Sequence, residues 1–347
     1  MHRLVMTIAA GLLLIASAPS LAGVTFKIVT ASERGTYHVI GHDLAKFVAP
    51  AAGIDLEVVP TSGSATNVQL LRHEPGVKLA IVQADVYQAF IDRSKGKNAE
   101  ARRLIEPLRV VLPLYDTEIH YIVRADSKMN SIHDIKDAKI NGGLVGSGAA
   151  FITHTVYRMM FDAPIAEANA SYLSNEQALV KLISDKTVDV VVVAAGQPAP
   201  LIANMKPEAQ KYIKLLKFDP DHPSSPLALK TYGAYTVRAS SYPHLLKQDF
   251  TTIAVGAYLV TYNYPASETS TYLARFAGSL CENLARLQAE GHPKWRDVSL
   301  GLQNLRPGWV YYRPTANAIR ACLANNEARA AQKKACSAEE RILGLCK

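Results

Sequence analysis

Short runs of β-branched and apolar residues alternate with segments of helical periodicity from Thr25 onward, and this alternation most constrains the fold. Strands that alternate with helices form parallel sheets covered on both faces. The first part of the chain contains three such units. Their expected strands and helices are, in chain order, 26–29, 39–48, 56–59, 65–71, 77–82 and 84–91.

Two extended runs, 109–114 and 119–123, follow with no helix between them, and the alternation then restarts. We interpret these runs as a crossing into a second lobe, and 232–237 as the return. Lobe 1 is expected to comprise 23–118 and 236–264, and lobe 2 to comprise 119–235. Residues 265–347 form a helical extension. Two α/β lobes joined by two crossings enclose a hinged cleft suited to a small ligand.

The N-terminus resembles a secretory signal peptide. Arg3 precedes an apolar stretch, and Ser20-Leu21-Ala22 offers a small-x-small cleavage site. We expect residues 1–22 to be removed and the protein to work in the periplasm. The alternative is an uncleaved membrane anchor.

The four cysteines all lie in the last quarter of the chain. An even number in an exported protein favours disulfides. We predict the pairs Cys281–Cys322 and Cys336–Cys346, with a zinc site as the alternative.

The composition is that of a soluble globular protein, with 49% apolar and 20% charged residues. The formal net charge of +8 is scattered along the chain. Nucleic acid binding requires a concentrated basic face with interleaved aromatics, so we expect no nucleic acid partner. The protein is expected to be a monomer.

Loops that follow predicted strands and precede predicted helices carry small hydroxyls and glycines. Backbone N–H groups at such places approach anions closely. Glycine and serine also serve there simply as turns and caps. The candidate loops are Ser32-Glu33-Arg34-Gly35-Thr36-Tyr37, Thr61-Ser62-Gly63-Ser64, Gln83-Ala84-Asp85 and Gly146-Ser147-Gly148.

Signatures of enzymes are mostly missing from the sequence. It has no GxSxG elbow and no HExxH motif, and its ten histidines are dispersed. Asp116 and Glu118 have the spacing of paired carboxylates, but we interpret them as hinge-surface charges. We expect no catalytic residue, no metal and no cofactor.

Five motifs together resemble the TAXI family, the solute-binding subunits of tripartite ATP-independent periplasmic (TRAP) transporters. The resemblance covers roughly 26–264. It rests on Gly35-Thr36-Tyr37, Thr61-Ser62-Gly63-Ser64-Ala65-Thr66-Asn67, Ile81-Val82-Gln83-Ala84-Asp85-Val86, Asn141-Gly142-Gly143-Leu144-Val145-Gly146-Ser147-Gly148 and Ala195-Gly196-Gln197-Pro198-Ala199-Pro200.

The resemblance implies a two-lobe periplasmic-binding-protein-like (type II) fold. It also implies a ligand such as glutamate, glutamine, 2-oxoglutarate or a related dicarboxylate, which is delivered to the membrane permease subunits. The chain departs from the family with Arg34 in place of glycine, Val39 in place of proline and Ala149 in place of threonine. Arg34 either reaches into the cleft or points to solvent.

We expect the small anionic solute to be held by main-chain amides of both lobes. Tyr37 either contacts the ligand or packs in the core. Asp85 either caps the following helix or binds a ligand ammonium. The expected ligand-binding residues are Arg34, Gly35, Thr36, Tyr37, Ser62, Gly63, Ser64, Asn67, Gln83, Asp85, Gly146, Ser147, Gly148 and Gln197. The alternatives are a periplasmic ligand sensor and an exported enzyme.

Overall fold

The computed structural model describes residues 23–94, 99–335 and 338–345. Within these residues ten strands form one sheet with the order β2-β1-β3-β10-β4-β7-β5-β6, while β8 pairs with β4 and β9 with β10. The strands are β1 (Val24–Val29), β2 (Ile54–Val59), β3 (Val77–Gln83), β4 (Leu108–Arg124), β5 (Ile140–Asn141), β6 (Ala170–Ser171), β7 (Val190–Ala194), β8 (Ile213–Leu215), β9 (Gly233–Val237) and β10 (Phe250–Tyr262).

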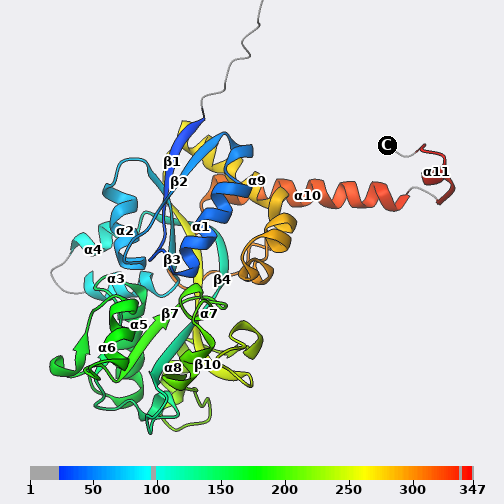
Figure 1. Ribbon diagram of the computed structural model, residues 1–347. Helices are drawn as coiled ribbons and strands as arrows, with labels where there is room; N and C mark the ends of the chain where they lie inside the picture. Colours follow the sequence, from blue (N-terminus) through cyan, green and yellow to red (C-terminus); the bar gives the residue numbers. More distant parts are fainter. Residues whose placement is uncertain (1–22, 95–98, 336–337, 346–347) are drawn as a thin grey trace, which may run out of the picture.

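Helices cover both faces of the sheet (Figure 1). They are α1 (Thr36–Phe47), α2 (Ser64–His73), α3 (Val86–Ser94), α4 (Ala99–Ile105), α5 (Gly148–Phe161), α6 (Asn175–Ile183), α7 (Pro200–Ala203), α8 (Ser225–Thr231), α9 (Glu268–Glu290), α10 (Arg313–Ala335) and α11 (Ala338–Ile342). The short 3-10 helix η6 (Pro293–Asp297) follows α9.

The molecule has the two-lobe α/β architecture expected from the sequence. We call lobe 1 the part built on β1, β2, β3 and the adjoining halves of β4 and β10. Lobe 2 is built on β5 to β9 and the other halves of the same two strands. Each lobe has a hydrophobic cluster on either face of its sheet. Buried parallel strands such as β7, with the sequence VVVVA, are apolar throughout because both faces are covered.

The two lobes are joined by β4 and β10, which run antiparallel through both of them. β10 pairs with β3 of lobe 1 through Ala257 to Val260, and with β9 of lobe 2 through Phe250 to Ala254. The two extended runs predicted from the sequence, 109–114 and 119–123, therefore belong to the single strand β4. The return to lobe 1 is β10, whereas 232–237, expected to be the return, contains a lobe 2 strand. A short β-branched run looks the same in sequence whether it crosses or pairs within a lobe.

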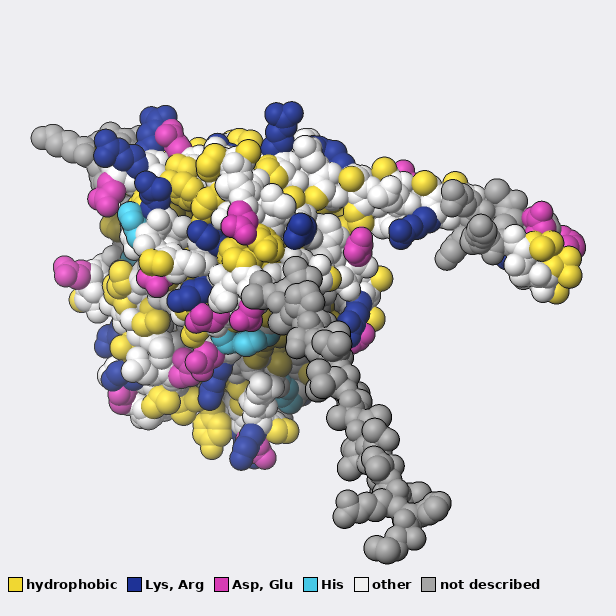
Figure 2. Space-filling view, turned by 90° about the horizontal axis from the view of Figure 1, so that it is seen from above, with side chains coloured by type: hydrophobic (Ala, Val, Ile, Leu, Met, Phe, Trp, Pro, Cys, Tyr) yellow, Lys and Arg dark blue, Asp and Glu magenta, His cyan; other side chains and the backbone are white. Residues whose placement is uncertain are grey.

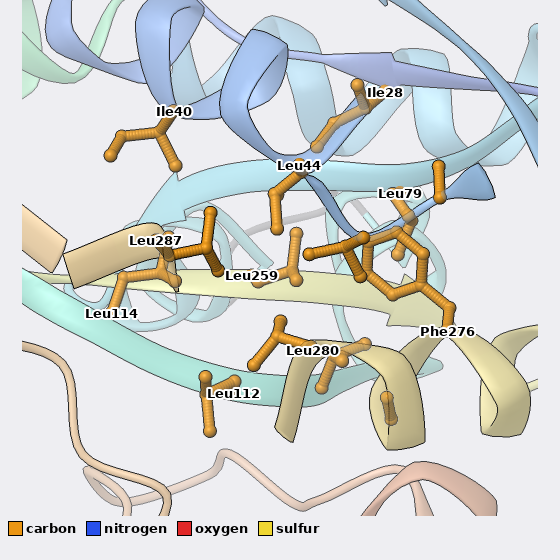
Figure 3. Packing of buried hydrophobic residues seen from close by; sticks show 14 of the residues in the cluster. Ile28, Ile40, Leu44, Leu79, Leu112, Leu114, Leu259, Phe276, Leu280 and Leu287 are labelled. Carbon is orange, nitrogen blue, oxygen red and sulfur yellow. The ribbon is translucent and has the colours of Figure 1, made fainter. Parts of the chain in front are cut away.

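The segment after 265 begins with α9, which completes the core of lobe 1. Phe276, Leu280 and Leu287 of α9 are fully buried against residues of α1 and the sheet (Figure 3). The predicted disulfide Cys281–Cys322 is confirmed and ties α9 to α10. The predicted signal peptide 1–22 and the cysteines Cys336 and Cys346 lie outside the described residues.

The second half of α10 extends away from the body of the molecule as an arm (Figure 1). Its residues 324–331 are all exposed. The far end of the arm carries exposed apolar side chains, visible in Figure 2, and these include Ile342, Leu343 and Leu345. Among the described residues, no helix is both long enough and apolar enough to cross a membrane.

Candidate functional site

A cavity of about 90 Å³ lies between the lobes where the strands of both end. It is below the ~300 Å³ at the lower end of typical ligand pockets, so it suits a small solute. Many of its lining residues belong to loops between a strand and a helix or to the first turn of that helix. They are Ala31, Ser32, Arg34, Gly35, Thr36, Tyr37, Thr61, Ser62, Gly63, Ser64, Gln83, Gly143, Leu144, Ser147, Gly148, Ala149, Ser174, Asn175, Glu176, Val193, Ala194, Ala195 and Leu201.

The N-terminus of α1 opens onto this cavity without a side-chain cap. Gly35 is the N-cap residue, and no side chain accepts a hydrogen bond at this helix end. The buried Thr36 hydroxyl instead donates to the Gly196 carbonyl of lobe 2, at 2.6 Å. Uncapped N–H groups and the helix dipole favour a negative charge at this position.

The N-terminus of α2 meets lobe 2 directly. Gly63 has a φ of +123°, a conformation that residues with a Cβ rarely adopt, and its Cα faces Ser147. The Gly146 carbonyl accepts from the N–H of Ala65, at 3.1 Å, so a lobe 2 backbone group caps a lobe 1 helix. The Ser64 hydroxyl is used within lobe 1, where it accepts from Gln83 N–H at 3.0 Å.

The two lobe 2 helices at the cavity are capped by their own residues. The Ser147 hydroxyl accepts from Ala150 N–H at the start of α5. Ser174 and Gln177 form a reciprocal capping box at the start of α6. These caps engage the third N–H group of each helix, that of Ala150 in α5 and that of Gln177 in α6, and no side chain of the described residues accepts from the first two.

The Gln83 side chain fills the gap between the lobes beside Gly148. A Cβ on Gly148 would lie only 2.1 Å from Gln83 Oε1, so only glycine allows this approach. Gln83 is 3% exposed, and its Oε1 has no hydrogen-bond partner among the described residues. A buried unpaired carbonyl oxygen costs free energy unless a ligand or water pairs with it.

Charged side chains meet at the mouth of the cavity. Arg34 is exposed and lines the opening together with Glu176 of lobe 2.

Tyr37 is buried, its hydroxyl lies 3.2 Å from Thr117 Oγ1, and burial raises its pKa. Tyr37 thus belongs to the lobe 1 core and also forms part of the cavity wall.

Four predicted ligand residues lie outside the cavity lining: Asn67, Asp85, Gly146 and Gln197. Gly146 and Asp85 line a second space between the lobes. Asn67 is buried and donates to the carbonyls of Thr30 and Ile81, which fixes the strand ends beneath α2. Gln197 donates to Glu118 and to the Thr236 carbonyl, and it accepts from Arg238 N–H. Because these contacts occupy both side-chain amides, the two residues position the walls of the site.

Asp85 belongs to a second, larger space between α3 and α5, of about 940 Å³, which Gln83 and Gly148 also line. The Tyr232 hydroxyl of lobe 2 donates to Asp85 Oδ2 at 3.0 Å. Burial raises the pKa of Asp85 to about 6, although this hydrogen bond and Arg306 lower it. Asp85 therefore contacts the opposite lobe.

The prediction that Glu118 is a hinge-surface charge is wrong, whereas Asp116 is exposed. Glu118 is fully buried where β4 crosses between the lobes, and Lys294 Nζ of η6 lies 2.7 Å from its Oε1. Lys294 also contacts Asp297 at 2.9 Å. Burial lowers the pKa of Lys294, but the two carboxylates raise it by more than burial lowers it, so the net shift is upward.

Sequence reasoning missed the Ser174-Asn175-Glu176 contribution to the site. These residues follow β6 and begin α6, so the rule that selected the other loops applies to them as well. Asn175 Oδ1 is a second buried oxygen without a partner among the described residues. Within the same residues, no group of three or more His, Cys, Asp or Glu is arranged to hold a metal ion.

Comparison with known proteins gives one family match. The model of the NMT1-like family matches residues 28–305.

Three solved structures are similar to the chain at low identity. The periplasmic binding protein BugD is 15% identical, with 87% of this chain and 94% of BugD covered and a TM-score of 0.49. The binding-protein component of an ABC phosphonate transporter from Pseudomonas aeruginosa is 15% identical, with 90% and 99% covered and a TM-score of 0.47. The substrate-binding protein of an amino acid ABC transporter is 12% identical, with 78% and 96% covered and a TM-score of 0.45.

Proposed function

The chain belongs to the NMT1-like family, and we propose that it is a periplasmic solute-binding receptor that captures a small carboxylate between its lobes. The observation that carries this proposal is the uncapped N-terminus of α1 facing a cavity at the lobe interface. The N–H groups of Gly35 and His38 already donate to the Ser32 and Gly35 carbonyls, so those of Thr36 and Tyr37 are the ones that a carboxylate would use.

Lobe 2 supplies the other side of the proposed binding site. The loop of Gly146 and Ser147 contacts the start of α2, and Gly148 lies against Gln83. A ligand held by α1 would then be enclosed by groups from both lobes, and closure would exclude water from it. Exclusion of water strengthens each hydrogen bond to the ligand charge.

The charged side chains at the cavity bear on the charge of the solute. Arg34 and Glu176 line the cavity, and Glu33 lies beside Arg34 at its opening, so the side chains supply one cation and two anions. A ligand that carries an ammonium as well as carboxylates fits these charges together with the positive end of the α1 dipole. We propose glutamate, with 2-oxoglutarate and related dicarboxylates as the alternatives. We propose that the ligand is delivered to the membrane permease of a TRAP transporter, as the TAXI resemblance implies.

Thermal unfolding with added L-glutamate, L-glutamine and 2-oxoglutarate tests the binding step. A ligand that binds only the folded state stabilises it by about 2.7 kcal/mol at a hundred times its Kd. Arg34→Ala is expected to weaken binding about tenfold. Lys46→Ala, which removes an exposed cation at the other end of α1, is expected to leave it unchanged. Equal losses in the two variants would contradict a specific role for Arg34, and no stabilisation by any of the anions would contradict the proposed capture.

Uptake of labelled ligand tests the delivery step. In cells that express this protein with its permease, uptake is expected to require an ion gradient and to persist after ATP depletion. Binding without any permease-dependent uptake would favour a ligand sensor instead.

A further inference from the structure

A pair of histidines on the outer surface of α1 lies outside the proposed ligand site. His38 and His42 are one helical turn apart, so their side chains share one face of the helix. Their Nε2 atoms are 3.1 Å apart. His42 is exposed and His38 is half-buried, so the two nitrogen atoms can be reached from solvent.

This separation matches the geometry of a shared metal ion. Bonds of ~2.05 Å from two imidazole nitrogens to one ion place the nitrogens ~2.9 Å apart at a right angle and ~3.3 Å apart at the tetrahedral angle. The observed 3.1 Å lies between these values. In the structure the two nitrogens share a hydrogen bond, so an ion that binds here replaces its proton and both rings turn until their lone pairs converge on the ion.

The contacts of His38 leave its metal-facing nitrogen without a proton. The Thr30 hydroxyl has one hydrogen and donates it to the Val59 carbonyl at 3.1 Å. Thr30 Oγ1 therefore accepts from His38 Nδ1, at 3.2 Å. The Nδ1–H tautomer leaves the lone pair of Nε2 directed at His42. Histidines that bind metals are usually oriented by such a hydrogen bond from their other nitrogen.

We propose that His38 and His42 form a two-histidine site for a divalent first-row metal ion of the Cu²⁺, Ni²⁺ or Zn²⁺ class. Imidazole ligands select these ions over Mg²⁺ and Ca²⁺, which prefer oxygen. Water completes the coordination, because two protein ligands leave the other positions of the ion open. His38 is the third residue of α1, so this site lies within one helical turn of the proposed carboxylate site.

Titration of the full chain with NiCl₂, ZnCl₂ and MgCl₂, followed by calorimetry, tests this site. We expect one equivalent of Ni²⁺ and of Zn²⁺ to bind, EDTA to reverse the binding, and Mg²⁺ to give no heat. His42→Gln is expected to abolish this equivalent. His73→Gln, which changes an exposed histidine on α2, is the matched control and is expected to leave it intact.

The orientation of His38 is tested by Thr30→Val, which removes the acceptor of its Nδ1 proton. Loss of a hydrogen bond that orients a metal-binding histidine costs about 10–100-fold in metal affinity. Circular dichroism checks that each variant is folded. The Cu²⁺-loaded protein is expected to show coupling of the electron spin to two imidazole nitrogens, and to one in His42→Gln. Undiminished binding in His42→Gln, or loss of binding in His73→Gln, would overturn the proposal.

Discussion

The cavity and the hinge differ in how their buried polar groups are paired. At the hinge, Glu118, Lys294 and Gln197 satisfy one another and the neighbouring backbone. At the cavity, Gln83 Oε1 and Asn175 Oδ1 have no partner among the described residues, and α1 has no side-chain cap. Buried side-chain atoms without a partner also occur elsewhere among the described residues, on Asp85, on Tyr115 and Tyr121 of β4 and on Arg124. Those of Gln83 and Asn175 differ in lining a space that a solute can enter, so an external partner is expected there.

Breaking the hinge network should have the largest effect. Lys294→Met leaves Glu118 as a buried charge without its cation, which is expected to cost about 3–5 kcal/mol of the free energy of unfolding. Urea unfolding measures this loss. Glu118→Gln added to Lys294→Met is expected to recover part of the stability, because the uncompensated charge is gone. A loss as small as that of the surface variant Lys46→Met would show that the hinge network carries little stability.

Asp85, which lines the larger space between the lobes and not the hinge, provides the second test of the comparison. Its pKa is about 6 when folded and 3.8 when unfolded, so the ionised group destabilises the folded state above pH 6 and has no such effect below pH 3.8. Asp85→Asn keeps an acceptor for the Tyr232 hydroxyl. It is expected to raise the free energy of unfolding by about 3 kcal/mol at pH 8, at ~1.4 kcal/mol for each pKa unit.

The stabilisation by Asp85→Asn should decrease as the pH falls through 6 toward 4. Urea unfolding of both proteins at pH 8 and pH 4.5 checks this difference. An effect of the same size at the two pH values would mean that the Asp85 charge is not its cause.

Gln83→Met should have the smallest effect on stability. It tests most directly whether the unpaired oxygen at the cavity is kept for a ligand. Methionine has a similar shape and no unpaired oxygen, so the free energy of unfolding is expected to rise by about 1 kcal/mol. Carboxylate affinity is expected to fall about tenfold if this amide pairs with the ligand. A drop in stability would show that the amide is already paired in the free protein.

The strand and helix alternation predicted the lobe 1 elements and most of the cavity loops because both depend on local sequence patterns. The partners of Glu118 and Gln197 could not be predicted in this way. Lys294 lies 176 residues after Glu118 in the chain, and no spacing in the sequence relates them. Gln197 follows a strand as the cavity residues do, but the direction of its side chain depends on Glu118.

Asn67 and Asp85 illustrate the same limit on the lobe 1 side. In the sequence, both residues follow a predicted strand or lie in the first turn of a predicted helix, where side chains are expected to face the cleft. Asn67 is turned inward by two carbonyls from different strands, and Asp85 is held by a tyrosine of the other lobe. Tertiary hydrogen bonds of this kind decide which polar residues of a loop are free for a ligand.

The two connecting strands also restrict how the halves of the protein move. β4 and β10 are hydrogen-bonded to each other from Leu108 and Tyr262 to Glu118 and Ala254. The ladder has register shifts between Gly256 and Tyr258 and between Leu259 and Val260, and the two strands must bend together when the lobes move. Opening of the two lobes therefore bends β4 and β10 together, and the hydrogen bonds between these strands oppose the bending.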